Sequence, residues 1–300
     1  MDKLDMNILS RLLNNCRESD RQIGMELGMS GGAVRARIQK MQERKIIEEF
    51  FIKVEPPVLG YGILYFVVSG QNINEILEQA NLVGEPYFVV PCIGGITVCG
   101  ISIKENLNQK TELAKKLMKD VRVLSIFEAE NPGFSSNLTK TDLEILQELI
   151  KNPRQKIEQV AKDTKMSTKT ITRCIEKLYE NDGIQFTLVY DPKKIDNFIP
   201  HAILTWIKGD LKETLENMND VFSESYLQIP FIAKNQIVLF VYSDNIFKMD
   251  ELTQKVRNIK NVESADLFIP KKILFYTKWI EKAFDDFKKS PKLHLTYETN

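Results

Sequence analysis

Five cationic side chains lie in one segment between Ser30 and Lys45. They are Arg35, Arg37, Lys40, Arg44 and Lys45, against the single anion Glu43. Arginine and glutamine can hydrogen-bond base edges, whereas further cations bind phosphates without reading sequence. Small residues at the start of a helix let it approach a duplex closely. We therefore predict DNA contacts from Ser30, Gly31, Gly32, Arg35, Arg37, Gln39, Lys40 and Arg44; the alternative is a solvated cationic helix face.

Three predicted helices position this face. The first spans residues 3–15, in which apolar residues recur at helical spacing. The second begins at Ser19, where Gln22 completes a capping-box pattern, and ends at Gly28, which can adopt a left-handed turn. The third is capped by Ser30 and runs to about residue 44, with Val34, Ile38 and Met41 facing inward. The alternating residues 46–56 that follow predict a β wing.

The net charge, the hydropathy and the cysteine content restrict the class of protein. Formal net charge is zero over 300 residues, so any nucleic-acid surface must be local. No apolar run approaches the roughly 20 residues of a membrane span, and the N-terminus does not form a signal peptide, which predicts a cytoplasmic protein. The 4 cysteines form no CxxC pair and are expected to be buried reduced thiols, with a zinc site as the alternative. No cofactor is predicted.

Residues 57–133 show a different pattern, in which predicted strands and helices are mixed. Their order is strand, helix, two strands hinged at Gly94 and Gly95, helix, strand. This order predicts a four-stranded antiparallel sheet with both helices on one face. The other face would need cover from a second sheet or a partner chain. The polar and glycine-containing residues 131–137 mark a linker.

The first pattern restarts at Leu138. Asp5 corresponds to Asp142, an offset of 137 residues that holds without gaps through the three-helix unit, and the sheet unit repeats too. We predict an α+β chain in which two winged helix-turn-helix domains alternate with two ferredoxin-like βαββαβ domains. The predicted boundaries are 1–56 and 138–192 for the winged domains, 57–133 and 193–270 for the ferredoxin-like domains, and 271–300 for a C-terminal helix and tail.

The two copies differ at the predicted reading face. The second copy carries Thr168, Lys169, Thr172, Cys174 and Glu176 where the first carries Gly31, Gly32, Arg35, Arg37 and Gln39. The predicted DNA contacts of the second copy are Thr168, Lys169, Thr172, Arg173 and Lys177. The two copies are therefore expected to read different sequences, or the second to contact mainly phosphates.

The residues after Pro270 form an amphipathic pattern. One helical face is lined by Tyr276, Ile280, Ala283, Phe284 and Phe287, with Trp279 beside them. We expect this helix to pack against the second ferredoxin-like domain. A contact between chains is the alternative.

The three-helix unit resembles the Lrp/AsnC (leucine-responsive) family of transcription regulators. The residues that carry the resemblance are Asp5, the pair Ile8-Leu9, Arg17, Ser30, Arg37 and an exit near Pro57 that ends in Leu59-Gly60. The resemblance is close over about 1–130 and looser over about 138–270, so the chain resembles two family units fused in tandem, as in archaeal relatives. It implies a sequence-specific transcription regulator whose partner is double-stranded DNA, and no enzymatic activity.

The same resemblance implies how the sheet domains work. Family sheets pair face to face, so the two sheets of this chain would form an intramolecular pseudo-dimer, and the chain would form homo-oligomers. Family members bind an amino acid or a similar small effector between paired sheets, beside a loop with glycine followed by an acidic residue. Residues 91–95 and 230–234 lack the acidic residue, which leaves open whether an effector binds.

Two other functions are alternatives to a transcription regulator. A tetrapyrrole decarboxylase resembling this architecture would want His and Arg side chains at a sheet cavity, and His201 is the one histidine at the start of a predicted strand. The sequence shows no paired carboxylates, nucleophile motif or phosphate-binding glycine loop. A protein-interaction scaffold with relic DNA-binding units is the other alternative. DNA affinity that falls steeply with salt separates a regulator from both.

Overall fold

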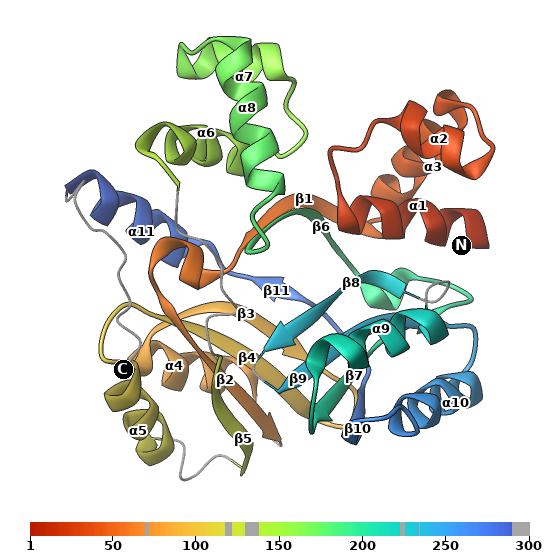
Figure 1. Cartoon of the computed structure of the whole chain (residues 1–300), viewed down its shortest axis with the longest axis vertical. Helices are drawn as coiled ribbons and strands as arrows, with labels where there is room; N and C mark the ends of the chain where they lie inside the picture. Colours follow the sequence, from red (N-terminus) through yellow and green to blue (C-terminus); the bar gives the residue numbers. More distant parts are fainter. Residues whose placement is uncertain (70–71, 118–121, 130–137, 223–225, 234, 290–300) are drawn as a thin grey trace. The chain divides into compact units, whose positions relative to one another are not determined.

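The structure is a computed structural model that describes residues 1–69, 72–117, 122–129, 138–222, 226–233 and 235–289. In the described residues, groups of three consecutive helices are each followed by a mixed segment of strands and helices (Figure 1). The chain divides into two compact units, Met1–Glu49 with Val90–Gly94 and Thr187–Ile273, and Phe50–Val89 with Gly95–Phe186 and Leu274–Asn300. Each unit thus combines the helix-turn-helix of one half with the sheet of the other half. The predicted linker 131–137 lies outside the described residues.

The first helix-turn-helix forms as predicted. Its helices are α1 (Lys3–Asn14), α2 (Asp20–Leu27) and α3 (Gly31–Glu43). The Ser19 side chain accepts a hydrogen bond from the Gln22 backbone, and the Gln22 side chain accepts one from the Ser19 backbone, which is the predicted capping box. Gly28 ends α2 with φ +67°, a conformation that favours glycine. Ser30 caps α3 by accepting from the Ala33 backbone at 3.1 Å.

The second helix-turn-helix repeats this plan. Its helices are α6 (Lys140–Lys151), α7 (Ile157–Thr164) and α8 (Thr168–Tyr179). Thr139 caps α6 with a capping box and Ser167 caps α8. At the start of α7, Lys156 stands where Ser19 stands in the first copy and makes no side-chain cap. The internal repeat therefore predicts the helices correctly, but not each cap.

The strand after each helix-turn-helix is present, and the two strands pair with each other. They are β1 (Ile47–Val54) and β6 (Ile184–Tyr190), which form a two-stranded sheet. The Asp191 backbone donates to the Ile46 carbonyl at 3.0 Å, and the Glu55 backbone donates to the Gly183 carbonyl at 2.8 Å. Short 3-10 helices follow the strands, η1 (Pro56–Leu59) and η3 (Pro192–Lys194). The predicted wing strand thus finds its partner in the other half of the chain.

The first ferredoxin-like domain has the predicted element order. Its elements are β2 (Gly62–Ser69), α4 (Ile73–Val83), β3 (Glu85–Pro91), β4 (Ile96–Ile103), α5 (Leu107–Leu117) and β5 (Arg122–Ala129). The strand order is β11-β3-β4-β2-β5, so a fifth strand, β11 (Leu274–Phe275), extends the predicted four. Gly94 and Gly95 turn the hairpin with φ values of +84° and +78°.

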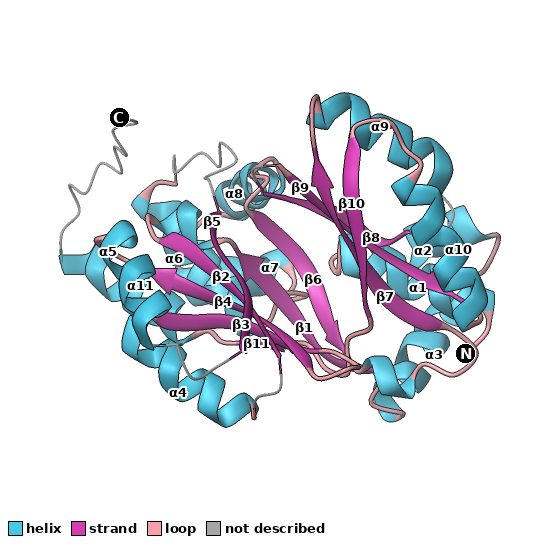
Figure 2. Cartoon of the chain, turned by 90° about the horizontal axis from the view of Figure 1, so that it is seen from below, coloured by secondary structure: helices cyan, strands magenta, loops and turns pink. Residues whose placement is uncertain are grey.

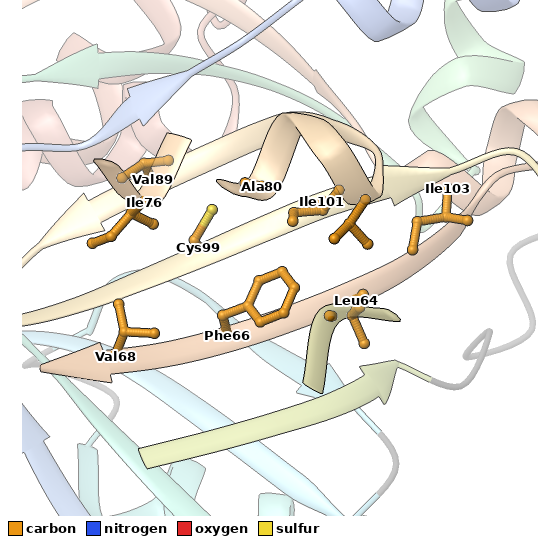
Figure 3. Packing of buried hydrophobic residues seen from close by; sticks show 11 residues of the cluster. Leu64, Phe66, Val68, Ile76, Ala80, Val89, Cys99, Ile101 and Ile103 are labelled. Carbon is orange, nitrogen blue, oxygen red and sulfur yellow. The ribbon is translucent and has the colours of Figure 1, made fainter. Parts of the chain in front are cut away.

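One hydrophobic cluster joins the helices of this domain to one face of its sheet (Figure 3). Alternate residues of β2 and β4 supply the sheet side, because successive strand residues point to opposite faces. Helix α4 adds Ile76 and Ala80, and α5 adds Ala114. The sheet residues of the cluster are Leu64, Phe66, Val68, Val89, Cys99, Ile101 and Ile103.

The second ferredoxin-like domain is built in the same way. Its elements are β7 (Ile199–Ile207), α9 (Leu211–Phe222), β8 (Tyr226–Ala233), β9 (Gln236–Ser243), α10 (Ile246–Arg257) and β10 (Val262–Phe268). The strand order is β10-β7-β9-β8, and the pairs are antiparallel. Helices α9 and α10 lie on one side of this sheet, where they share one apolar core with its strands (Figure 2).

The C-terminal segment forms the predicted helix but packs elsewhere. Strand β11 (Leu274–Phe275) pairs with β3, and α11 (Lys278–Lys289) follows it. Trp279 is 1% exposed and lies edge-on to Tyr61 and Tyr87. The expected packing on the second ferredoxin-like domain is therefore wrong. Strand β3 would otherwise be an edge with unpaired backbone groups, and β11 satisfies part of it.

Among the described residues, no helix combines the length and the apolar character that crossing a membrane requires. The 4 cysteines, Cys16, Cys92, Cys99 and Cys174, are buried thiols that form no disulfide, as predicted. Burial raises the pKa of Cys92 to about 11 and that of Cys99 to about 12. These thiols are consequently protonated and unreactive at neutral pH.

Candidate nucleic-acid interface

The first turn of α3 packs closely on α2. A Cβ added at Gly31 would lie 3.2 Å from the Arg21 Cα, so this glycine is needed for the contact between the two helices. A Cβ added at Gly32 would meet only the Ser30 hydroxyl, at 3.9 Å. Gly32 and Ser30 are exposed. Gly31 thus has a packing role, and close approach to DNA stays a prediction for all three residues.

Arg35 projects from α3 next to the start of α2. Its Nε donates to Asp20 Oδ2 at 2.9 Å, while the Arg35 side chain is 70% exposed and that of Asp20 is 13% exposed. The guanidinium is therefore tethered at one nitrogen and otherwise open to solvent. Sequence reasoning missed Asp20. The signal that could have found it is the second copy, where Ile157 and Thr172 replace both members of the pair.

Gln39 and Lys40 extend the exposed face of α3 by one turn beyond Arg35. Both residues are exposed. Lys40 makes no salt bridge within the described part of the chain. An uncompensated lysine of this kind is available to a phosphate, which agrees with its predicted role.

Arg37 turns from α3 toward α1. Its Nη1 lies 2.8 Å from Asp2 Oδ2 and 2.6 Å from Asp5 Oδ1. The hydrogen bond with Asp2, followed by that with Asp5, raises the pKa of the Arg37 guanidinium. A phosphate contact by Arg37 stays a prediction. The phosphate would have to compete with Asp2 and Asp5 for the guanidinium. The geometry assigns Arg37 at least a role in holding α3 against α1.

Arg44 caps the end of α3 and forms a salt bridge with Asp196 in the same compact unit. The N-terminal residue is held at the same loop, because Asn197 donates to the Met1 carbonyl at 3.1 Å. Helix α1 also lies along β8, where Asn14 Oδ1 accepts from the Ile229 backbone at 2.9 Å. The first helix-turn-helix is thus fixed to the second ferredoxin-like domain at both ends of α1.

In the second copy a different cation holds α8, the helix that corresponds to α3, against α6. Lys177 Nζ lies 2.6 Å from Asp142 Oδ2, and these residues correspond to Lys40 and Asp5 of the first copy. Burial alone raises the pKa of Asp142, but the hydrogen bonds from Lys177 and Thr139 outweigh it and lower that pKa below its usual value. The cation that pairs with α6 has therefore moved from the Arg37 position, where Cys174 stands, to the Lys40 position.

The outward face of α8 retains two cations. Lys169 and Arg173 are exposed, as are Thr168 and Glu176. The Thr172 hydroxyl donates to the Thr168 carbonyl at 3.0 Å, so this side chain is occupied by its own helix. Within the part of the chain that the structure describes, the face of α8 therefore carries two exposed cations and no arginine that is bonded to a carboxylate.

His201 was the candidate for a decarboxylase-like site. It is 2% exposed, and its Nδ1 lies 2.9 Å from the Ile199 carbonyl. Burial lowers the pKa of His201, which keeps the ring neutral at pH 7. This setting matches the alternative of a packed histidine near a strand end.

Comparison with known proteins identifies relatives of the chain. An AsnC-type helix-turn-helix domain matches residues 1–42, and a winged helix-turn-helix DNA-binding domain matches residues 138–184. The chain is 31% identical over 127 residues to the HTH-type transcriptional regulator Ptr1 of Methanocaldococcus jannaschii, covering 41% of this chain and 86% of that protein. The HTH-type transcriptional regulator LrpA of Pyrococcus horikoshii is 32% identical over 89 residues, covering 30% of this chain and 63% of LrpA.

Solved structures of similar architecture include the siroheme decarboxylase NirDL, at a TM-score of 0.48 and 14% identity over 97% of this chain and 99% of that one. Another is AsnC of E. coli, at a TM-score of 0.30 and 22% identity over 44% of this chain and 94% of that one. The match to most of the length of Ptr1, together with the AsnC-type domain over α1–α3, shows that the chain belongs to the Lrp/AsnC family of DNA-binding transcription regulators.

Proposed function

We propose that α3 is the principal sequence-reading helix of this regulator and that α8 mainly contacts phosphates. The observation that carries the proposal is the contrast between Arg35 and Thr172 at corresponding positions. Arg35 is exposed and tethered by Asp20, whereas the Thr172 hydroxyl bonds to its own helix. A tethered guanidinium suits recognition of a guanine, and loose exposed cations suit phosphates.

The other exposed residues of the two helices support the same division. Gln39 on α3 can donate to and accept from an adenine edge. Glu176 holds that position on α8, where its charge would repel phosphates unless it met a cytosine amino group. Lys169 and Arg173 then provide affinity without strong preference for a sequence.

We also propose that the two ferredoxin-like domains pair as an intramolecular pseudo-dimer. The face of the first sheet away from α4 and α5 carries the apolar β2 residues Ile63, Tyr65 and Val67, which are buried and therefore support a covered rather than a solvent-facing sheet face. A small effector would bind between paired sheets. Light scattering of the purified chain, with and without DNA, tests whether homo-oligomers form in addition.

The proposal assigns no reaction to the chain, since His201 is buried and bonded to a backbone carbonyl. The DNA-binding role is tested by measuring the affinity of the full chain for a duplex between about 50 and 200 mM salt, a range over which phosphate-binding proteins lose much of their affinity. We expect log affinity to fall linearly with log salt. Lys40→Ala should reduce the slope by about 1, as expected for one lost phosphate contact.

Glu43→Gln is the matched control for Lys40→Ala, because it also changes one charge on α3 but removes an anion. It should not reduce the salt slope. An affinity that does not change with salt, or no affinity at the lowest salt, would contradict DNA binding and favour the interaction-scaffold alternative.

A further inference from the structure

We propose that Asp20 is a positioning residue that fixes Arg35 for recognition of one guanine, without touching DNA itself. This inference rests on the proposed reading role of α3. The Asp20 carboxylate accepts from Arg35 Nε at 2.9 Å. A guanidinium has five N–H groups in a planar fork, so a bond from Nε leaves the N–H groups of both Nη atoms for another acceptor, and the Arg35 side chain is 70% exposed. The two Nη donors are the pair that can bond guanine O6 and N7 together.

Asp20 is itself held in place. It is the first residue of α2, directly after the capping box of Ser19 and Gln22, and its side chain is 13% exposed. A carboxylate at this position also interacts favourably with the positive end of the helix dipole. The anchor for Arg35 is consequently a half-buried carboxylate at the start of a helix, unlike a partner on a fully exposed side chain.

Gly31 brings the pair together. A Cβ at Gly31 would lie 3.3 Å from the Arg21 nitrogen and 3.4 Å from the Asp20 carbonyl carbon, so α3 begins directly against the backbone of α2. Arg35 lies four residues after Gly31 and therefore on the same face of α3. This close start places the Arg35 side chain within reach of Asp20.

The second copy changes all three residues together. Ile157, Thr168 and Thr172 stand where Asp20, Gly31 and Arg35 stand in the first copy. The caps of the two recognition helices are nonetheless the same, Ser30 and Ser167. The glycine, carboxylate and arginine are therefore not required to build a helix-turn-helix of this kind. They form a set that belongs to the reading role of α3.

The test measures discrimination at single base pairs with the full chain. A binding selection on random duplexes defines the preferred site, and affinities are then measured for all single-base variants of that site. Arg35→Ala should abolish discrimination at one guanine. A bidentate contact favours guanine over the other bases at that position by about tenfold or more in affinity. Asp20→Asn, which keeps the shape but removes the charge, should reduce discrimination at that same base pair at least about threefold, since a looser guanidinium forms fewer paired bonds.

Three further results distinguish positioning from a structural role. Asp20→Asn should leave the other base preferences and the affinity for random DNA at or above the wild-type level, because it removes a negative charge near the duplex. The double variant should discriminate no worse than Arg35→Ala alone. Asp20→Glu, which keeps a carboxylate, should recover part of the discrimination and serves as the test if Asp20→Asn does not fold.

Unchanged discrimination in Asp20→Asn, beside a loss in Arg35→Ala, would overturn the positioning role and leave the reading role of α3 intact. A uniform loss of affinity for every sequence in Asp20→Asn would also overturn it. If Arg35→Ala keeps every base preference, the proposed reading role itself is wrong. Glu43→Gln is the control for charge removal and should leave every preference unchanged.

Discussion

The cations of the two recognition helices fall into three settings at the level of single residues. Arg35 is tethered and exposed, Arg37 and Lys177 are paired with carboxylates of the first helix of their copy, and Lys40 has no salt bridge among the described residues. A count of positive charges treats these residues alike. The setting of each cation is the basis on which we propose a base reader, a structural pair and a phosphate contact.

The Lys177–Asp142 pair makes the second helix-turn-helix sensitive to acid. The folded-state pKa of Asp142 is lowered, so its contribution to stability is complete above the unfolded-state pKa, near 3.8, and is lost as pH falls through the folded-state value. Asp142→Asn should therefore lower the unfolding free energy by about 1 kcal/mol at pH 6. The difference between wild type and variant should shrink as pH falls below the unfolded-state pKa and vanish below the lowered folded-state pKa, where the aspartate is protonated in both states.

Chemical denaturation of both proteins across this pH range checks the prediction. Lys177→Met is a useful companion, because loss of the ammonium leaves burial to raise the pKa of Asp142. A difference between wild type and Asp142→Asn that stays constant from pH 6 to pH 3 would show that the pair does not contribute through its charge.

Sequence reasoning recovers side chains that act within one turn of chain, but not those that act across helices. Ser19, Gln22, Gly28 and Ser30 cap their helices as predicted, because capping depends on neighbours three or four residues away. The bond between Arg35 and Asp20 joins two helices. This bond requires α3 to pack on α2. Helical periodicity predicts which face of α3 packs inward, but not which two atoms form a bond between the helices.

At the level of elements, the order of helices and strands follows from local periodicity, and their partners do not. The βαββαβ order of both ferredoxin-like domains agrees with the prediction, whereas β11 adds an unpredicted fifth strand to the first sheet. Strand β1 pairs with β6, and β11 pairs with β3, although each pair is far apart in sequence. Edge strands are completed by whatever strand the fold brings near them, so a sequence pattern alone does not specify the partner.

The C-terminal helix gives a test at this level. Trp279 is 1% exposed and packs on Tyr61 and Tyr87, so Trp279→Ala should destabilise the packing of α11 by about 3–5 kcal/mol. Hydrogen exchange should become faster in peptides from β3 and α11. Peptides from β8, which belongs to the other compact unit, should change much less.

Phe247→Ala provides the control for Trp279→Ala. The Phe247 side chain is 81% exposed, so its loss should change stability by no more than about 0.5 kcal/mol. Equal exchange in β3 for wild type and Trp279→Ala would mean that β11 and α11 do not stabilise the edge of the first sheet.

At the level of the whole molecule, the tandem duplication produces two units that each mix both halves of the chain. One unit contains α1–α3 with the second ferredoxin-like domain, and the other contains α6–α8 with the first. Each helix-turn-helix is therefore attached to the sheet that follows the other one in sequence. A fused chain of this kind can present two different DNA-reading surfaces, which two identical subunits cannot do.

The most direct test of this account is a binding selection on random duplex DNA with three versions of the full chain. They are wild type, a variant of α3 with Arg35→Ala and Gln39→Ala, and a variant of α8 with Lys169→Ala and Arg173→Ala. We predict that wild type and the α8 variant select the same motif, with lower affinity for the α8 variant, and that the α3 variant selects none. The account is contradicted if the α3 variant keeps the motif, or if wild type selects two identical and equally strong half-sites.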